Sequence, residues 1–154
     1  MTNTQSYQYL ESGLDNVWIE GVQPITDDAG EVCHGFDNPK GLHRAIAQVI
    51  VSKSGLSGRE LKFLRSELGL TQDQLADVLH NSSLTVSRWE RGTHPIDPNA
   101  ETIIRVLAIE KLNLKKVKDV VGLAKLSISE AQTCTIRIDG SDPSNYREFK
   151  QRAA

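Results

Sequence analysis

Hydroxyl and guanidinium groups are concentrated between residues 82 and 93 of this 154-residue chain, where the sequence is SSLTVSRWERGT. A guanidinium presents a rigid fork of donors that fits paired acceptors, such as O6 and N7 of guanine or two phosphate oxygens. The neighbouring serine and threonine hydroxyls can donate to and accept from the same groups. Arg88 therefore offers the most specific chemistry in the chain, which is recognition through hydrogen bonds.

Residues suited to covalent or metal chemistry form no comparable pattern. The sequence has no Gly-rich phosphate loop, no recognisable nucleophile with a His and a carboxylate, and no cysteine pair with ligand spacing. Cys33 and His34 could form half of a metal site, but a packed cysteine beside a surface histidine is the more frequent arrangement. We expect no catalytic residues, no metal and no cofactor, and hence a protein that is not an enzyme.

Two short helices joined by a tight turn are predicted from Thr71 onward. Thr71 and Gln74 have the spacing of a capping box, so the first helix should begin at Thr71. Its apolar positions recur at helical spacing and predict one packing face, formed by Leu75, Val78 and Leu79.

The turn that follows consists of residues that tolerate left-handed backbone or favour helix N-caps, namely His80, Asn81, Ser82 and Ser83. A second helix should begin at one of the two serines. Its inward residues would be Val86 and Trp89, and Gly92 would end it.

The same stretch resembles the Xre/Cro family of helix-turn-helix regulators. The matching positions span both helices and are Thr71, Gln72, Leu75, Ala76, Ser82, Thr85, Val86, Ser87, Arg88, Trp89, Glu90 and Gly92. The chain departs from the family pattern at two positions, where His80 replaces the usual turn glycine and Asn81 replaces an apolar residue. With its flanking helices, the likeness covers about a third of the chain.

The resemblance implies double-stranded DNA as a partner, with the N-terminal end of the second helix in the major groove. Arg88 is the candidate for sequence readout, and Gln72 is the candidate for a phosphate contact beside exposed helix amides. The expected DNA-binding residues, of which the last two are backbone contacts, are Gln72, Ser82, Ser83, Leu84, Thr85, Ser87, Arg88, Arg91 and Thr93. The alternative is that Arg88 pairs with Glu90 or Glu67 on a solvated face.

A four-helix DNA-binding domain is predicted over residues 56–113. Ser57 and Glu60 form a second capping box before the motif, and Asp97 followed by Pro98 provides an N-cap and a first helical residue after it. The apolar stripes of these two flanking helices are Leu61, Phe63, Leu64 and Leu68, and Ile103, Ile104, Leu107, Ala108 and Leu112.

A homodimer is expected, because paired half-sites one DNA turn apart, about 34 Å, multiply affinity and specificity. Ile109 and Leu114 are apolar residues beyond those needed to cover the motif. They form either a dimer seam or part of the same core, and the sequence favours neither.

Charge is distributed unevenly along the chain, although the formal total is only −2. Residues 1–52 hold two basic and seven acidic residues, residues 53–118 hold eleven and eight, and residues 119–154 hold five of each. The basic excess thus coincides with the helix-turn-helix. Because it amounts to +3, we expect moderate nonspecific DNA affinity that falls with salt.

A small α+β N-terminal lobe for dimerisation or partner binding is predicted over residues 1–55. Short alternating or β-branched runs at 7–9, 17–22 and 31–36 predict an antiparallel sheet. A helix over 41–52 and a joint over 53–58 should follow, the helix burying Leu42, Ile46, Val49 and Ile50. Trp18 and Ile19 either form a partner surface, or one of them anchors the sheet; Trp18 is the favoured anchor.

Residues 114–154 are predicted to hold a helix, a strand and a tail. Leu114, Val117 and Val121 continue helical spacing, and the lysines at 115, 116 and 118 either touch DNA or form a solvated helix end. A strand around Ile136 could join the N-terminal sheet, and a loosely held end should follow Gly140. The expected fold class is therefore α+β: an all-α helix-turn-helix domain of four to five helices with a small β-containing lobe.

A second resemblance concerns residues 9–22, YLESGLDNVWIEGV. This segment, placed before a helix-turn-helix, is similar to MqsA-type antitoxins, in which a toxin-binding domain precedes an Xre-like domain. The resemblance implies a toxin protein as a possible partner. Those antitoxins carry zinc-binding cysteine pairs in the N-terminal domain, and this chain has only Cys33 there, so the zinc is not carried over.

The expected function is sequence-specific transcriptional regulation by a dimeric repressor that binds a palindromic operator through the helix beginning near Ser83. The alternative is an antitoxin whose N-terminal lobe neutralises a toxin and whose helix-turn-helix autoregulates the operon. No window approaches the roughly 20 apolar residues of a membrane span, and the N-terminus lacks signal-peptide character, so we expect a cytoplasmic protein without membrane contact.

Overall fold

The chain forms two compact units in a computed structural model that describes residues 5–22, 25–33, 35–128, 130 and 134–150. The first unit combines residues 1–46 with 134–154, and the second spans 47–133. The predicted division into residues 1–55, 56–113 and 114–154 stays a prediction.

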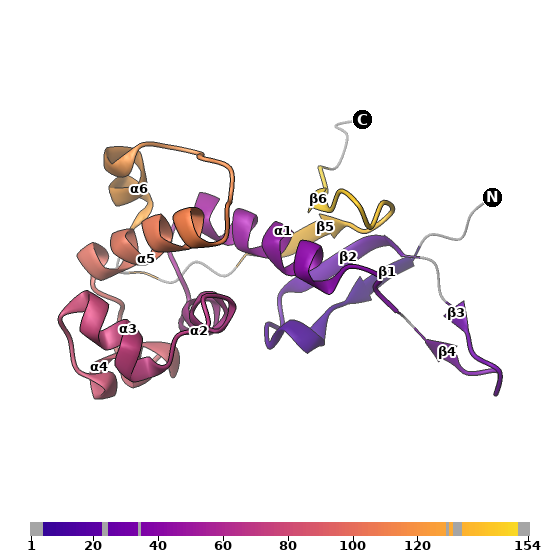
Figure 1. The fold of residues 1–154 in the computed structure, drawn as a ribbon, viewed down its shortest axis with the longest axis horizontal. Helices are drawn as coiled ribbons and strands as arrows, with labels where there is room; N and C mark the ends of the chain where they lie inside the picture. Colours follow the sequence, from indigo (N-terminus) through magenta and orange to yellow (C-terminus); the bar gives the residue numbers. More distant parts are fainter. Residues whose placement is uncertain (1–4, 23–24, 34, 129, 131–133, 151–154) are drawn as a thin grey trace. The chain divides into compact units, whose positions relative to one another are not determined.

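A mixed four-stranded sheet forms the centre of the first unit, in the order β1-β2-β5-β6 (Figure 1). β2 pairs antiparallel with β1 and parallel with β5, where Val17 lies opposite Ile136, and β5 pairs antiparallel with β6. The predicted C-terminal strand thus joins the N-terminal sheet, and the α+β class is confirmed. The strands are β1 (Gln5–Gln8), β2 (Val17–Val22), β5 (Ile136–Asp139) and β6 (Arg147–Glu148).

Three expectations for the first unit were wrong. Ile19, not Trp18, anchors the sheet, because alternate residues of a strand face opposite sides and Ile19 is fully buried while Trp18 is half-buried. The segment after Gly140 was expected to be loosely held, but its described part, up to residue 150, returns to the sheet as β6. The run 31–36 contributes only β4 (Val32–Cys33), which pairs with β3 (Ile25–Thr26) outside the main sheet. The Cys33 side chain and His34 lie outside the described residues.

Helix α1 (Pro39–Ser52) begins in the first unit and ends in the second. Its buried stripe includes Leu42, Ile46 and Ile50, as predicted, while Val49 is only half-buried. In the first unit, the hydroxyl of Tyr9, after β1, lies 2.8 Å from Nε2 of His43. A short 3₁₀ helix, η1 (Leu10–Ser12), precedes β2.

Besides the end of α1, the described residues of the second unit form five helices, and four of these begin at the predicted caps Ser57, Thr71, Ser82 and Asp97. The expected helical run from Leu114 was wrong, because no helix spans 112–119 and the last helix starts after its own N-cap, Asp119. The helices are α2 (Gly58–Glu67), α3 (Gln72–Leu79), α4 (Ser83–Glu90), α5 (Pro98–Lys111) and α6 (Val120–Leu126).

Two predicted core residues of the second unit are exposed. Val78 of α3 and Ile103 of α5 have 44% and 43% of their surface accessible. Both lie beside residues that are buried, Leu79 and Ile104, so the packing stripe of each helix is narrower than the apolar pattern. In the described part of the chain, no helix is long and apolar enough to cross a bilayer.

The charged pair Arg105 and Glu101 is completely buried in the second unit. Arg105 Nη2 donates to Glu101 Oε1 at 3.1 Å, and Arg105 Nη1 donates to the carbonyls of Ile50 and Val51 at 3.1 and 2.9 Å. Burial raises the pKa of Glu101, and the Arg105 charge opposes that shift. The pair ties the last turn of α1 to α5.

Candidate nucleic-acid interface

The first helix of the motif, α3, begins with a complete capping box. The Thr71 hydroxyl accepts from the Gln74 backbone amide at 3.1 Å, and Gln74 Oε1 accepts from the Thr71 amide at 2.9 Å. Leu75 and Ala76 then pack inward. The sequence alone predicted this helix start because both partners lie within one turn.

The turn between α3 and α4 requires a left-handed residue, and His80 adopts that conformation with φ 54° and ψ 43°. The backbone amide of Asn81 then donates to the carbonyl of Ala76 at 2.9 Å, which closes the end of α3. The Asn81 side chain donates to the Leu79 carbonyl at 3.0 Å. The two residues that depart from the family pattern thus serve the same turn.

The second helix, α4, is defined at both ends by local hydrogen bonds. At its start, the Ser82 hydroxyl accepts from the Thr85 amide at 3.2 Å. At its end, Gly92 has φ 73°, and the amide of Thr93 donates to the Arg88 carbonyl at 3.1 Å. Val86 and Trp89 are 0% and 5% exposed, as their predicted core role requires.

The outer face of α4 carries the side chains that could reach a ligand. Because a helix has about 3.6 residues per turn, Leu84, Arg88 and Arg91 lie on the side away from Val86 and Trp89. All three are exposed. Ser83, Thr85 and Ser87 flank this face and are half-buried. The structure therefore brings the expected base-contacting residues onto one short helix.

Several of the expected DNA-binding groups also serve local structure. The hydroxyls of Ser82 and Thr85 lie 2.9 Å apart, and the Thr93 hydroxyl donates to the Arg88 carbonyl at 3.1 Å. Arg91 Nε donates to the Ser87 carbonyl at 3.3 Å. The Arg88 guanidinium, in contrast, has no ion pair or hydrogen bond with any described residue. The alternative pairing of Arg88 with Glu90 is not formed.

Glu90 instead links the three helices of the motif region. Its carboxylate is 4% exposed and accepts from Arg65 of α2, with Nη2 at 3.3 Å from Oε2 and Nε bonded to Oε1. Gln72 Nε2 of α3 donates to the same Oε2 at 2.6 Å. Sequence reasoning missed this network. The available sign was that Glu90 lies four residues after Val86 and so shares its inward face.

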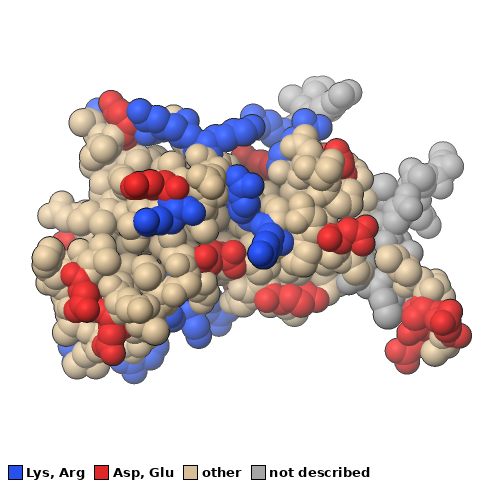
Figure 2. All heavy atoms as spheres, in the orientation of Figure 1, with Lys and Arg blue, Asp and Glu red and all other residues tan. Residues whose placement is uncertain are grey.

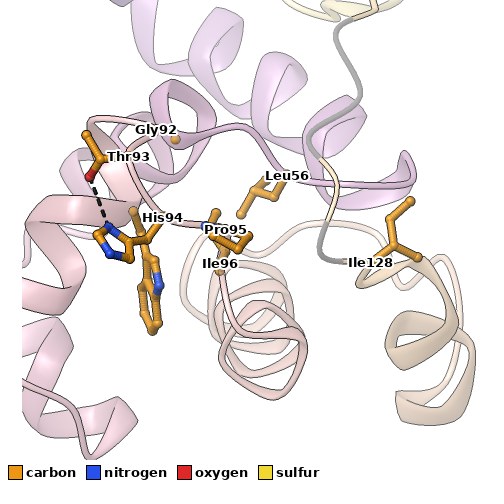
Figure 3. Close-up of a pocket in the computed structure, with 9 residues that line it drawn as sticks. Leu56, Gly92, Thr93, His94, Pro95, Ile96 and Ile128 are labelled. Carbon is orange, nitrogen blue, oxygen red and sulfur yellow. Dashed lines mark hydrogen bonds between the residues drawn. The ribbon is translucent and has the colours of Figure 1, made fainter.

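A cavity of about 290 Å³ lies at the C-terminal end of α4. Its walls come from Trp89, the loop after Gly92, the segment before α2 and Ile128 (Figure 3). Thr93 and His94 face each other there, with Oγ1 and Nδ1 at 3.2 Å. Gly58 permits the close approach of α2 to α4, because a Cβ there would lie 2.3 Å from the Trp89 carbonyl oxygen.

The two units differ in formal charge. The first holds six basic and ten acidic residues and the second holds twelve and ten. Acidic side chains gather at the turn between β3 and β4, which carries Asp27, Asp28 and Glu31 (Figure 2). In the described residues, no group of three or more His, Cys, Asp and Glu side chains could hold a metal ion.

Comparison with protein families matches residues 61–114 to a family model described as helix-turn-helix. The match begins in α2 and includes α3, α4 and α5, so it covers the elements that carry the exposed face of α4. Comparisons with curated proteins and with solved structures found no match. This part of the chain is a helix-turn-helix domain of the Xre/Cro type, which supports a general role in DNA-binding transcriptional regulation.

Proposed function

We propose that the chain is a sequence-specific repressor that binds a palindromic operator as a homodimer, with α4 in the major groove. The observation that carries this proposal is the exposed outer face of α4, whose Arg88 guanidinium makes no bond to any described residue. Such a fork can bind O6 and N7 of guanine together. A dimer bound in the groove would exclude RNA polymerase from the same DNA, which is how it would repress transcription. We propose that the protein acts in the cytoplasm.

The remaining residues divide by their chemistry. Ser83, Leu84 and Ser87 lie at or beside the outer face of α4 and would approach base edges, together with Thr85. Gln72 has a second amide N–H besides the one donated to Glu90, and this N–H is available to a phosphate. Arg91, Thr93 and Ser82 would hold the register through backbone contacts.

Selection of bound sites from random double-stranded DNA with the purified full chain tests the proposal. We expect enrichment of a palindrome that contains a guanine in each half-site, because Arg88 is the strongest base-contacting group. Enrichment of a single asymmetric site would contradict the homodimer, and no enrichment at all would contradict sequence-specific binding.

Residues 9–22 favour a second candidate function, that of an antitoxin. This segment follows β1 and supplies η1 and β2, and it belongs to a compact acidic unit distinct from the DNA-binding unit. A unit of this kind could bind a basic toxin protein. The test is co-expression with any small reading frame next to the gene. Growth arrest by that neighbour, relieved by this chain, supports the antitoxin; arrest that the chain leaves unchanged argues against it.

A further inference from the structure

Leu84 is an exposed large apolar side chain on the outer face of α4, near the N-terminal end of the helix. It has 52% of its surface accessible and sits at the second helical position, four residues before Arg88. The other two residues of that face are arginines, and the flanking positions are serine and threonine. Leu84 is therefore the one apolar side chain among the outward positions of α4, and the other side chains there are polar and readily solvated.

The major groove offers such a side chain one apolar target. Its edges consist of hydrogen-bond donors and acceptors, apart from the C5-methyl group of thymine. A 5-methylated cytosine would present the same methyl group. We propose that Leu84 binds the C5-methyl group of a pyrimidine and makes that methyl a determinant of the operator. This inference rests on the proposed function, because it assumes that α4 lies in the major groove.

The spacing of Leu84 and Arg88 limits where the methyl group lies. Four residues advance about 6 Å along a helix, whereas stacked bases of one strand are about 3.4 Å apart. The two side chains lie on the same face of α4, because they are separated by about one turn. The methylated pyrimidine should therefore lie one or two base pairs from the guanine that Arg88 contacts.

Replacing thymine by uracil, one position at a time, in the selected operator tests the inference, since this removes only the methyl group. We expect one position per half-site at which the substitution weakens binding of the wild-type chain about fourfold, the effect of losing one buried methyl group. At that position, 5-methylcytosine should bind better than cytosine. Fluorescence anisotropy with the full chain measures each dissociation constant.

Leu84→Ala provides the decisive comparison, and Val78→Ala is its matched control. Val78 is also exposed but lies on α3. We expect Leu84→Ala to bind thymine and uracil operators equally, and Val78→Ala to keep the wild-type preference. Equal binding of both operators by the wild-type chain would overturn the inference while the proposed function stands. A chain that selects no DNA would overturn the function itself. Thermal melting should be unchanged in Leu84→Ala, since the side chain is exposed.

Discussion

The Arg88 guanidinium is the residue on which sequence readout depends most. Arg88→Ala should weaken binding to the selected operator by about 1–3 kcal/mol and relax the preference at one base position, because a bidentate base contact is lost. Competition titrations with operators that vary at each position measure both effects. Because the wild-type guanidinium bonds to no described residue, the substitution should leave the melting temperature unchanged.

Arg91 is the matched control for Arg88, because it is an exposed arginine on the same side, at the C-cap of α4. Its Nε already donates to the Ser87 carbonyl, which directs the side chain along the last turn of α4. Arg91→Ala should weaken operator and random DNA alike and lower the salt dependence by about one counterion. If Arg88→Ala behaved in this uniform way, Arg88 would contact only phosphate.

Among the elements, the turn between α3 and α4 has an unusual residue, because His80 holds a left-handed conformation that costs a non-glycine residue about 1–2 kcal/mol. His80→Gly should remove this strain. Glycine also makes the unfolded chain more flexible, which costs about 0.5–1 kcal/mol of stability, so the net stabilisation should be about 0–1.5 kcal/mol. Urea unfolding of the full chain provides the measurement.

Gly92 gives the reciprocal experiment at the end of α4. It has φ 73°, and a Cβ there would meet nothing within 4 Å, so only backbone strain opposes a side chain. Gly92→Ala should therefore destabilise the second unit by about 1 kcal/mol. A stabilised Gly92→Ala, or a destabilised His80→Gly, would contradict the account of both turns.

The buried pair between α5 and the end of α1 makes stability depend on pH through Glu101. Burial raises the pKa of this carboxyl above its ordinary value of 4.5. The folded state therefore binds a proton that the unfolded state has released, and this group stabilises the fold less as the pH rises above about 4.5. The free energy of unfolding of the wild-type chain, relative to that of Glu101→Gln, should therefore fall as the pH rises above about 4.5.

Unfolding of both proteins by urea across the acid range measures this difference, and the other carboxyls cancel because both proteins contain them. A difference that grew with pH would mean that the Arg105 charge outweighs burial. Arg105→Met is a separate control: it should cost about 3–5 kcal/mol at neutral pH, since it leaves the buried Glu101 without the Arg105 charge and removes the donor to Ile50 and Val51.

The elements that the sequence predicted best are those whose cause is local. The capping pair Thr71 and Gln74 and the terminator Gly92 each act within one turn, so spacing alone located both helices of the motif. What spacing could not show is pairing over distance. β6 is only two residues long, and Arg147 and Glu148 have no strand pattern until β5 lies beside them. Gln72 likewise meets Glu90 only after the helices pack.

At the scale of the whole molecule, the helix-turn-helix lies in the second unit, while the first unit is acidic. The single α4 of each chain can cover only one half-site. A homodimer would place its two copies of α4 one DNA turn apart, which is about 34 Å or 10–10.5 base pairs. Inserting about five base pairs between the half-sites turns them to opposite sides of the DNA. We expect this insertion to lower affinity to that of an isolated half-site.

Inserting a full turn of about ten base pairs returns the two half-sites to the same side of the DNA but increases the distance between them. Affinity should therefore recover only if the two copies of α4 in the dimer can move apart. Gel-shift titration of the three operators, with the stoichiometry taken from the mass of each complex, distinguishes the cases. The homodimer predicts two chains on the natural spacing and weak single-chain binding after the half-turn insertion. Equal affinity for all three operators would show that each chain binds its half-site independently.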